Sequence, residues 1–204
     1  MLFIGGILKG KSMKIVLASS NEHKVKEINA IVSELGIEFV LPPKGFNPVE
    51  DGDTFEENSF IKAYEAWKLA KTWTLADDSG LCIDALDGAP GIHSARYAET
   101  PQARINRVLQ EMQDVKNRSA CFKCCMTLIN PQGQVAYSYT GVCEGSIVES
   151  QRGTNGFGYD PIFLLKDSDK TMAELSDEEK NKISHRGKAL NFILNYLNGV
   201  KNAN

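Results

Sequence analysis

The first third of the chain shows the pattern of strands that alternate with helices. Short β-branched runs at residues 14–19 and 37–41 predict two buried strands. Between them, apolar residues recur at helical spacing as far as Gly36, which would end the helix. Thr54 and Glu57 then have the spacing of a capping box, which predicts the start of a second helix. The apolar residues of the first helix are Val25, Ile28, Ile31, Val32 and Leu35.

The rest of the chain adds extended segments and further helices. A third strand is predicted at residues 72–76, and the polar sequence Asp77-Asp78-Ser79-Gly80 indicates its carboxyl end. From residue 118, apolar residues alternate strictly with other residues, which is typical of a half-exposed strand, and a turn at residues 131–133 leads into a second extended run. The other predicted elements are a long loop at residues 87–97, a helix from Thr100 to about Asp114, extended chain at residues 145–150, a Gly-rich loop at residues 152–161, an apolar run at residues 162–165, and helices that start at Ser176 and Ser184.

The order of these elements predicts the fold class. Parallel-type strand–helix–strand units come first, antiparallel strands follow, and helices close the chain, which favours an α/β fold with a mixed central sheet flanked by helices. The 204 residues contain no internal repeat and no linker, so we expect one domain at residues 13–204. Met13 directly precedes the first convincing strand, and we therefore expect residues 1–12 to be an extension outside the fold.

Composition and charge narrow the class of protein. Hydrophobic residues make up 42% and charged residues 24%, which is the balance of a globular protein. The 26 acidic residues outnumber 23 basic ones, and no basic run is long enough to neutralise a nucleic-acid backbone. The apolar run at residues 2–8 is too short to cross a bilayer and lacks a signal-peptide cleavage pattern, and no later segment could span a membrane. We therefore expect neither a nucleic-acid partner nor a membrane.

The chain has five cysteines, which is an odd number, and their spacing is not that of a disulfide framework. This favours reduced thiols in a cytoplasmic protein. Cys121 and Cys124 have the spacing of half a zinc site, but no second pair follows them. They also lie in an alternating, strand-like run, where an odd separation places two side chains on opposite faces. We therefore expect buried, reduced cysteines in a cytoplasmic protein.

Two segments carry residues suited to phosphate chemistry. The sequence Ser19-Ser20-Asn21-Glu22-His23-Lys24 joins a strand to a helix, where backbone N–H groups and the helix dipole favour an anion; an ordinary helix cap with a solvated lysine is the alternative. No Walker-type phosphate loop is present.

Carboxylates form the second group. Acids that converge at the end of a central strand would require a cation among them, and Mg²⁺ is suited to that position. For Glu56 and Glu57 we favour helix capping, and for Asp77 and Asp78 a turn remains an alternative. The other acids of the group are Glu50 and Asp51.

Two further segments are suited to a flat ligand. Three glycines and two aromatic residues between Gly153 and Pro161 suggest a backbone that approaches the ligand closely and a ring that stacks on it; a flexible hairpin is the alternative. Near the last helix, Lys180, Lys188 and the sequence Ser184-His185-Arg186 could hydrogen-bond a planar acceptor, whereas a surface histidine is the alternative.

Taken together, these segments resemble the inosine triphosphate pyrophosphatases, enzymes that hydrolyse aberrant purine nucleoside triphosphates. The resemblance extends from residue 14 to about residue 198, and the residues from Ala89 to Tyr97 also look like a loop of that family. Five motifs occur in the family's order: Ser20-Asn21-x-x-Lys24-x-x-Glu27, Thr54-Phe55-x-Glu57-Asn58-x-x-x-Lys62-Ala63, Asp77-Asp78-Ser79-Gly80-Leu81, Gly156-Phe157-Gly158-Tyr159-Asp160-Pro161 and Ser184-His185-Arg186-Gly187.

The resemblance implies a reaction, a cofactor and site residues. It implies a fold of two lobes with a nucleotide cleft between them, and members of the family are commonly homodimers. The expected reaction is cleavage of dITP, ITP and XTP to the monophosphate and pyrophosphate, which cleanses the nucleotide pool. Glu50 and Asp78 would bind Mg²⁺, and Asp78 would also be the base for the attacking water. The residues that would bind substrate are Ser19, Ser20, Asn21, Glu22, His23, Lys24 and Lys62 for the triphosphate, Phe157 for stacking on the purine, Asp160, His185 and Arg186 for its edge, Lys180 for phosphate or base, and Ser79, Gly158 and Tyr159 beside them.

Base selectivity has a physical form in this hypothesis. Hypoxanthine and xanthine carry a 6-keto acceptor that donors such as His185 and Arg186 could pair with, whereas adenine presents a 6-amino donor. An unpaired buried donor costs about 1–3 kcal/mol, enough to bias the enzyme against ATP.

Two alternatives stay open. One is a Maf-like pyrophosphatase for modified pyrimidine or 7-methylguanosine triphosphates, although residues 19–24 lack that family's Ser-x-Ser-Pro-Arg-Arg type of start. The other is a nucleotide-binding or single-strand-binding module without catalysis, against which the paired acids argue.

Overall fold

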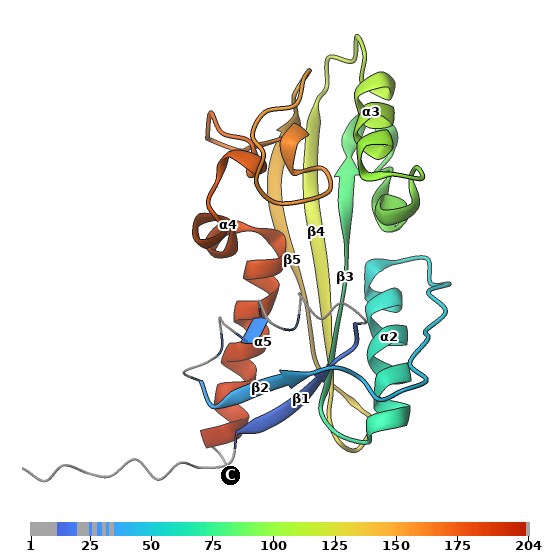
Figure 1. The fold of residues 1–204 in the computed structure, drawn as a ribbon, viewed down its shortest axis with the longest axis vertical. Coiled ribbons are helices and arrows are strands. Elements are labelled where there is room, and N and C mark those ends of the chain that lie inside the picture. The colour runs from blue at the N-terminus through green and yellow to red at the C-terminus, as the bar shows by residue number, and fades with distance from the viewer. Residues whose placement is uncertain (1–11, 20–24, 26–27, 30–31, 33–34, 203–204) are drawn as a thin grey trace, which may run out of the picture.

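A computed structural model describes residues 12–19, 25, 28–29, 32 and 35–202, with side chains described as far as residue 200. In these residues, six strands form one sheet in the order β2-β1-β3-β4-β5-β6 (Figure 1). The strands are β1 (Met13–Leu17), β2 (Ile37–Val40), β3 (Thr74–Ile83), β4 (Ser119–Ile129), β5 (Val135–Ile147) and β6 (Phe163–Leu165). The helices are α2 (Phe55–Ala70), α3 (Pro101–Glu111), α4 (Asp177–Ile183) and α5 (His185–Asn202), with short 3₁₀ turns at Asp84–Leu86, Gly91–Arg96, Asp160–Ile162 and Met172–Glu174.

The sheet is mixed, as predicted. Strand β1 pairs in parallel with β2 and β3, whereas β3, β4, β5 and β6 pair antiparallel in succession. Strand β1 reaches β3 only at Thr74 and Leu75, while β3 pairs with β4 along its whole length as far as Ile83. Beyond Leu75, no strand among the described residues pairs with this edge of β3.

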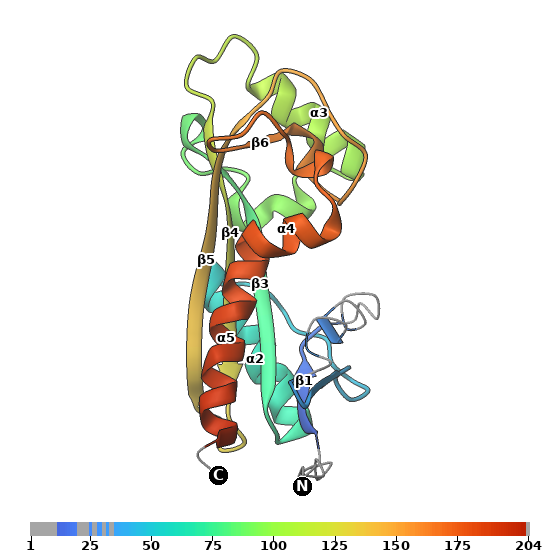
Figure 2. The ribbon, with the colours of Figure 1, turned by 90° about the vertical axis from the view of Figure 1, so that its left-hand side faces the viewer.

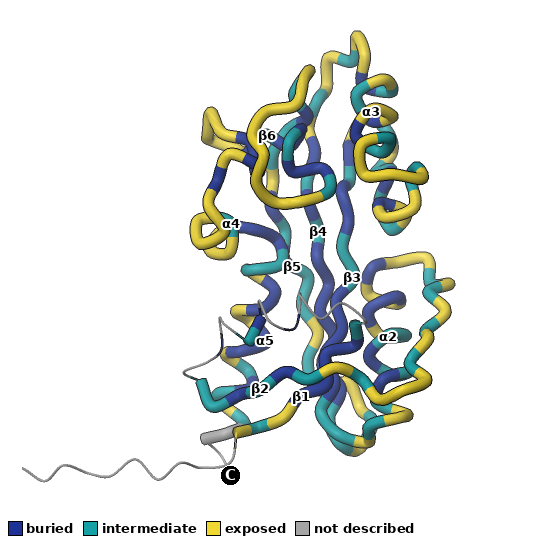
Figure 3. The backbone as a smooth tube through the Cα atoms, in the orientation of Figure 1, coloured by how far each residue is buried: buried dark blue, intermediate teal, exposed yellow. Residues whose placement is uncertain are grey.

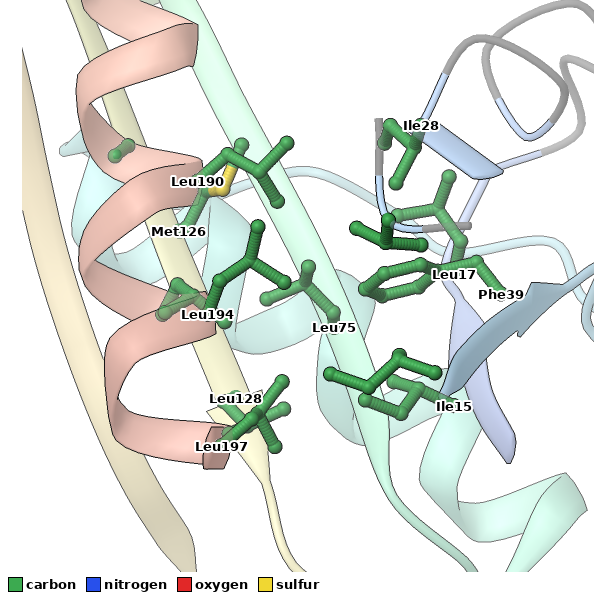
Figure 4. Close-up of a cluster of buried hydrophobic side chains, with 14 of the residues drawn as sticks. Ile15, Leu17, Ile28, Phe39, Leu75, Met126, Leu128, Leu190, Leu194 and Leu197 are labelled. Carbon is green, nitrogen blue, oxygen red and sulfur yellow. The ribbon is translucent and has the colours of Figure 1, made fainter. Parts of the chain in front are cut away.

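Two lobes are built on the long strands β3, β4 and β5, which run through both of them (Figures 1 and 2). In the lobe of β1 and β2, helices α5 and α2 pack on opposite faces of the sheet. Leu190 and Leu194 of α5 contact a cluster that includes Leu75 and Met126 (Figure 4), while the small Ala63 lets α2 approach the other face. A separate cluster of buried side chains between α3, β6 and the far ends of β3, β4 and β5 forms the core of the second lobe. Figure 3 colours the backbone by burial and shows that β3 and β4 are largely buried. Each lobe therefore has a core of its own.

Several predicted boundaries are confirmed, and others require correction. Capping boxes start α2 at Thr54 and α4 at Ser176, as predicted. In the predicted first helix, Val25, Ile28 and Val32 are helical, whereas Leu35 already lies in a turn, so the helix ends before it. Ile31 lies outside the described residues. The helix that begins after Thr100 ends at Glu111 rather than near Asp114, and the segment at residues 87–97 contains a 3₁₀ turn instead of only loop. Part of the extended chain predicted at residues 145–150 is the end of β5, which continues to Ile147. Within the described residues, no helix is both long enough and apolar enough to span a membrane.

Candidate active site

The sequence Asp77-Asp78-Ser79-Gly80 lies inside β3, so the prediction that the strand ends before it was wrong. Successive side chains of a strand point to opposite faces. Asp78 therefore points toward α2 and accepts a hydrogen bond from Lys62, whereas Asp77 and Ser79 point toward α5 and accept hydrogen bonds from Arg186. Polar residues of this kind suit a turn by composition, but pairing with β4 holds them in extended chain. The strand thus presents two different sites on its two sides.

The 3₁₀ turn at Gly91–Arg96 covers the edge of β3 directly beyond these residues. The Ser94 hydroxyl accepts a hydrogen bond from the N–H of Leu81 and donates one to the carbonyl oxygen of Gly91. A Cβ atom at Gly80 would lie 2.2 Å from that carbonyl oxygen, so only glycine fits there. Within the described part of the chain, the stretch of this edge without a neighbour is therefore limited to the residues between Leu75 and Gly80.

Lys62 joins two carboxylates on the α2 side of β3. Its ammonium group lies 2.7 Å from Glu50 Oε2 and 2.9 Å from Asp78 Oδ1. The side chains of Lys62 and Asp78 are only 12% and 13% exposed. The second oxygen of Asp78, Oδ2, is buried and has no hydrogen-bond partner in the described part of the chain. This oxygen therefore lacks the hydrogen bond or cation that a buried carboxylate oxygen requires.

Burial and mutual attraction shift the pKa values of this cluster. Burial raises the pKa of Asp78 above its ordinary value, and the attraction and hydrogen bond of Lys62 only partly oppose that rise. Burial also acts against the charge of Lys62, but the attraction of Asp78 and hydrogen bonds to Glu50 and Asp78 outweigh it and raise the lysine pKa. Asp78 is thus a better proton acceptor than an ordinary surface carboxylate, and Lys62 stays charged.

The donor set of Glu50 and Asp78 fits a hard divalent cation. Mg²⁺ takes oxygen ligands, commonly one or two protein carboxylates, and leaves its other positions to water and phosphate. Asp78 Oδ2 is an unpartnered buried atom that such an ion would satisfy. No group of three or more His, Cys, Asp or Glu side chains with ligand geometry occurs among the described residues. Of the acids that were expected to converge here, only Glu50 and Asp78 do so among the described residues, because Asp77 points to the other face.

Neither glutamate at the start of α2 belongs to this cluster. Glu57 closes the capping box by accepting hydrogen bonds from the N–H groups of Asp53 and Thr54. Glu56 accepts a hydrogen bond from the Thr140 hydroxyl. The contacts of Glu57 confirm the capping role that the sequence favoured, whereas Glu56 binds a strand residue instead of capping the helix.

A cavity of about 180 Å³ lies on the other side of β3, where α5 begins. Segments that are far apart in the sequence line this cavity. Among its lining residues are all those that the resemblance implies for contact with the base. Phe157 presents an exposed ring, with the Lys180 ammonium 4.5 Å from its centroid and the Arg186 guanidinium 5.5 Å away. The residues that line the cavity are Ser79, Gly80, Leu81, Ser94, Ala95, Arg104, Phe122, Phe157, Gly158, Tyr159, Asp160, Lys180, His185 and Arg186.

Asp160 organises the Gly-rich loop at this cavity. Its buried carboxylate accepts hydrogen bonds from Lys180 Nζ at 2.5 Å and from the N–H of Phe157 at 2.7 Å. Gly156 has φ = 74°, and a Cβ atom there would lie 2.2 Å from the Asp160 carboxylate. The loop is therefore a built platform for the Phe157 ring, rather than the flexible hairpin that was the alternative. Tyr159 anchors the loop from below, because its hydroxyl donates to the carbonyl oxygen of Ser94.

His185 is buried, which corrects the alternative of a surface histidine. Its ring stacks on Phe122 with centroids 4.8 Å apart, and its Nδ1 atom has no partner among the described residues. Burial, together with the nearby charges of Arg186 and Lys180, lowers the pKa of His185 to about 3. The imidazole is thus neutral at physiological pH.

The low pKa of His185 predicts a stability that depends on pH. Between pH 6.5 and about 3 the unfolded chain binds a proton at this residue that the folded chain does not. The free energy of unfolding should therefore fall as the pH falls through that window, by up to about 1.4 kcal/mol per pH unit. Urea unfolding between pH 7 and pH 4 checks this, and His185→Gln should make the decline less steep. Equal slopes for both proteins would contradict the burial argument.

Not every expected residue can be placed, and some lining residues were not expected. Ser19 follows the end of β1, where its N–H donates to the carbonyl oxygen of Leu17. The expected phosphate-binding residues Ser20, Asn21, Glu22, His23 and Lys24 lie outside the described residues. Sequence reasoning missed Ser94 and Arg104; Ser94 lies in the segment that resembles a family loop, whereas nothing in the sequence marks Arg104.

Comparison with known proteins agrees with this geometry. The family model described as the Ham1 family matches residues 15–196. A protein of Synechocystis named dITP/XTP pyrophosphatase is 43% identical over 92% of this chain and 96% of its own length, and one of the same name from Treponema denticola is 47% identical over 92% and 100%. The solved structure of a HAM1 protein from Coxiella burnetii has a TM-score of 0.84 at 43% identity, covering 91% of this chain and 98% of that one. The chain belongs to the Ham1 family.

Proposed function

We propose that this protein hydrolyses non-standard purine nucleoside triphosphates, dITP, ITP and XTP, to the monophosphate and pyrophosphate. The observation that carries the proposal is the pair of sites on β3: a Lys–carboxylate cluster on one side and an aromatic cavity on the other. A nucleotide has the same two parts, a polyanion and a flat base. The relatives named dITP/XTP pyrophosphatase support the reaction and the substrate class. Such an enzyme removes these nucleotides before they enter DNA or RNA.

The α2 side of β3 would handle the phosphates and the water. Lys62 is charged and positioned to neutralise phosphate oxygens, and the segment at residues 19–24 would add backbone N–H groups and Lys24. Glu50 and Asp78 would hold Mg²⁺, which supplies charge stabilisation to the phosphates when it is bound. Asp78 would take the proton from the attacking water, for which its raised pKa suits it. In this proposal water attacks the phosphorus atom itself, so the reaction requires no covalent nucleophile of the protein.

The cavity side would read the base. Phe157 would stack on the purine, and the platform built by Asp160 and Lys180 fixes its ring. His185, neutral and buried, would offer one N–H donor to a 6-keto oxygen. Part of the donor capacity of Arg186 is already used by Asp77 and Ser79, so we expect this residue to position as well as to bind. A 6-amino group would face these donors, which disfavours ATP.

The rival functions make different demands on the site. A Maf-like pyrophosphatase would act on modified pyrimidine or 7-methylguanosine triphosphates, and a binding module would need no raised carboxylate pKa beside a lysine. The two carboxylates around Lys62 favour catalysis over binding alone. We also propose that the protein is a homodimer, on the resemblance alone, and that it is cytoplasmic, on its odd number of cysteines.

Pyrophosphate release from ITP, dITP, XTP, GTP, ATP, CTP and UTP, with Mg²⁺ and with EDTA, tests the proposal. We expect fast release from ITP, dITP and XTP, and loss of that release in EDTA because the phosphates lose a cation. Release that favours a pyrimidine nucleotide would support the Maf-like rival. Nucleotide binding without release of pyrophosphate from any substrate would support the binding module.

A further inference from the structure

Two half-exposed cysteines lie directly opposite each other on neighbouring strands. Cys82 of β3 pairs with Cys121 of β4 in the antiparallel register, and both side chains are free thiols. The remaining cysteines, Cys124, Cys125 and Cys143, are buried, and in the described strands none of them pairs with another cysteine. The position of Cys82 and Cys121 therefore distinguishes them from the other three.

Backbone hydrogen bonds establish how close the two residues are. The N–H of Ile83 donates to Ala89, and its carbonyl oxygen accepts from Gly88, so both groups of Ile83 point away from β4. Because these directions alternate along a strand, the groups of Cys82 point toward β4, and Cys82 and Cys121 form a hydrogen-bonded pair. Such pairs have Cα atoms about 5.5 Å apart. That separation lies within the range of about 4.4–6.8 Å over which a disulfide can close.

The two thiols already interact with each other. The proximity of the two side chains is the main cause that raises the pKa of Cys82 and lowers the pKa of Cys121 to about 7, and the charge of Lys123 also lowers the pKa of Cys121. The thiolate is the reactive form in disulfide exchange, and an attacking thiol works best with a pKa near the ambient pH. Cys121 is thus suited to attack the disulfide of an oxidant, and Cys82 is suited to attack the mixed disulfide that results.

We infer that Cys82 and Cys121 form a dithiol–disulfide couple, a site of reversible oxidation separate from the nucleotide site. With a small-molecule disulfide as oxidant, the Cys121 thiolate attacks one oxidant sulfur, forms a mixed disulfide and releases the first thiolate. Cys82, as it loses its proton, then attacks the Cys121 sulfur, closes the protein disulfide and releases the second thiolate. The two protein thiols lose two protons and two electrons, and the oxidant takes them up as two thiols.

Reversibility follows from the position of the pair. Directly opposed strand residues have Cβ atoms about 4.5–5.5 Å apart, whereas a disulfide holds them at about 3.5–4.5 Å, so closure draws the strands together by about 1 Å. Strained or exposed disulfides have higher reduction potentials and are the labile ones. A thiol reductant should therefore reopen the bond without unfolding the protein.

Thiol counting on the full chain tests the inference. The reduced protein is incubated with oxidised glutathione, denatured and alkylated with N-ethylmaleimide, and its mass and non-reduced peptides are determined. We expect three of the five cysteines to be alkylated, with a disulfide-linked peptide pair that contains Cys82 and Cys121. Dithiothreitol, added to the folded oxidised protein, should restore alkylation of all five.

Single serine variants separate the expected mechanism from its rivals. Cys82→Ser should accumulate a glutathione adduct on Cys121, because the resolving thiol is missing. Cys121→Ser should form no internal disulfide, whereas the matched control Cys143→Ser should still form the Cys82–Cys121 bond. Five alkylated cysteines in the oxidised wild type, a persistent glutathione adduct on it, or a disulfide that includes another cysteine would each overturn the inference.

Discussion

Asp78→Asn should lower kcat for ITP hydrolysis by about 1,000-fold or more, the scale of a lost general base. The amide cannot take a proton from water, and its NH₂ group can face the Lys62 ammonium at the position where the carboxylate now accepts. It also removes one of the two carboxylate ligands proposed for Mg²⁺. Steady-state pyrophosphate release at saturating Mg²⁺ measures the loss.

The fold should survive this substitution, because burial already opposes the charge of Asp78 and Lys62 keeps Glu50 as a partner. Thermal unfolding should therefore shift by only a few degrees, and ITP binding should persist. Asp84→Asn is the matched control, since Asp84 is an exposed acid just beyond the end of the same strand. An Asp78→Asn protein with wild-type turnover would remove the catalytic role assigned to this carboxylate.

Lys180→Met should affect both stability and recognition of the base. The substitution leaves the carboxylate of Asp160, whose side chain is only 4% exposed, without its ammonium partner. Removing one member of a buried ion pair typically costs about 3–5 kcal/mol, and the hydrogen bond from the N–H of Phe157 should keep the cost near the lower figure. The Phe157 ring also loses the cation beside it, so KM for ITP should rise. Urea unfolding and steady-state kinetics measure the two effects separately.

Two further variants test the physical cause. Asp160→Asn combined with Lys180→Met should recover much of the lost stability, because no buried charge is then left uncompensated. Lys182→Met changes the same residue type on the same helix, where an exposed pair with Glu178 should contribute less than about 1 kcal/mol. Equal destabilisation by Lys180→Met and Lys182→Met would show that the Asp160 pair has no special role.

The sequence was sufficient for the fold class because hydrophobic periodicity predicted most elements. The capping boxes at Thr54 and Ser176 also gave correct helix starts, since they depend on contacts between near neighbours in the chain. The assignment failed at Asp77-Asp78-Ser79-Gly80, where composition indicated a turn. Ten successive pairs with β4 hold those residues in a strand, and pairing over such a sequence separation leaves no local pattern.

The candidate site was predictable in its members but not in its arrangement. The motifs identified Phe157, Asp160 and Lys180, yet only the folded chain shows that they form one ion-paired platform. Sequence adjacency suggested that Asp77 and Asp78 act together, whereas the pleat of β3 separates them onto two faces. Ser94 gave no signal of its own, because its importance comes from the edge of a distant strand.

The placement of both half-sites on β3 has a consequence for insertions and deletions. A loop can gain or lose a residue with little effect on its neighbours, but a strand with different partners on its two faces cannot. One residue inserted between Leu75 and Asp77 would rotate Asp78 toward the base pocket and direct Asp77 toward Lys62, exchanging the chemistry of the two sides. Length variation in this protein should therefore be tolerated in the hairpin at residues 130–134 and forbidden in β3, whose count of residues keeps the catalytic and recognition groups apart.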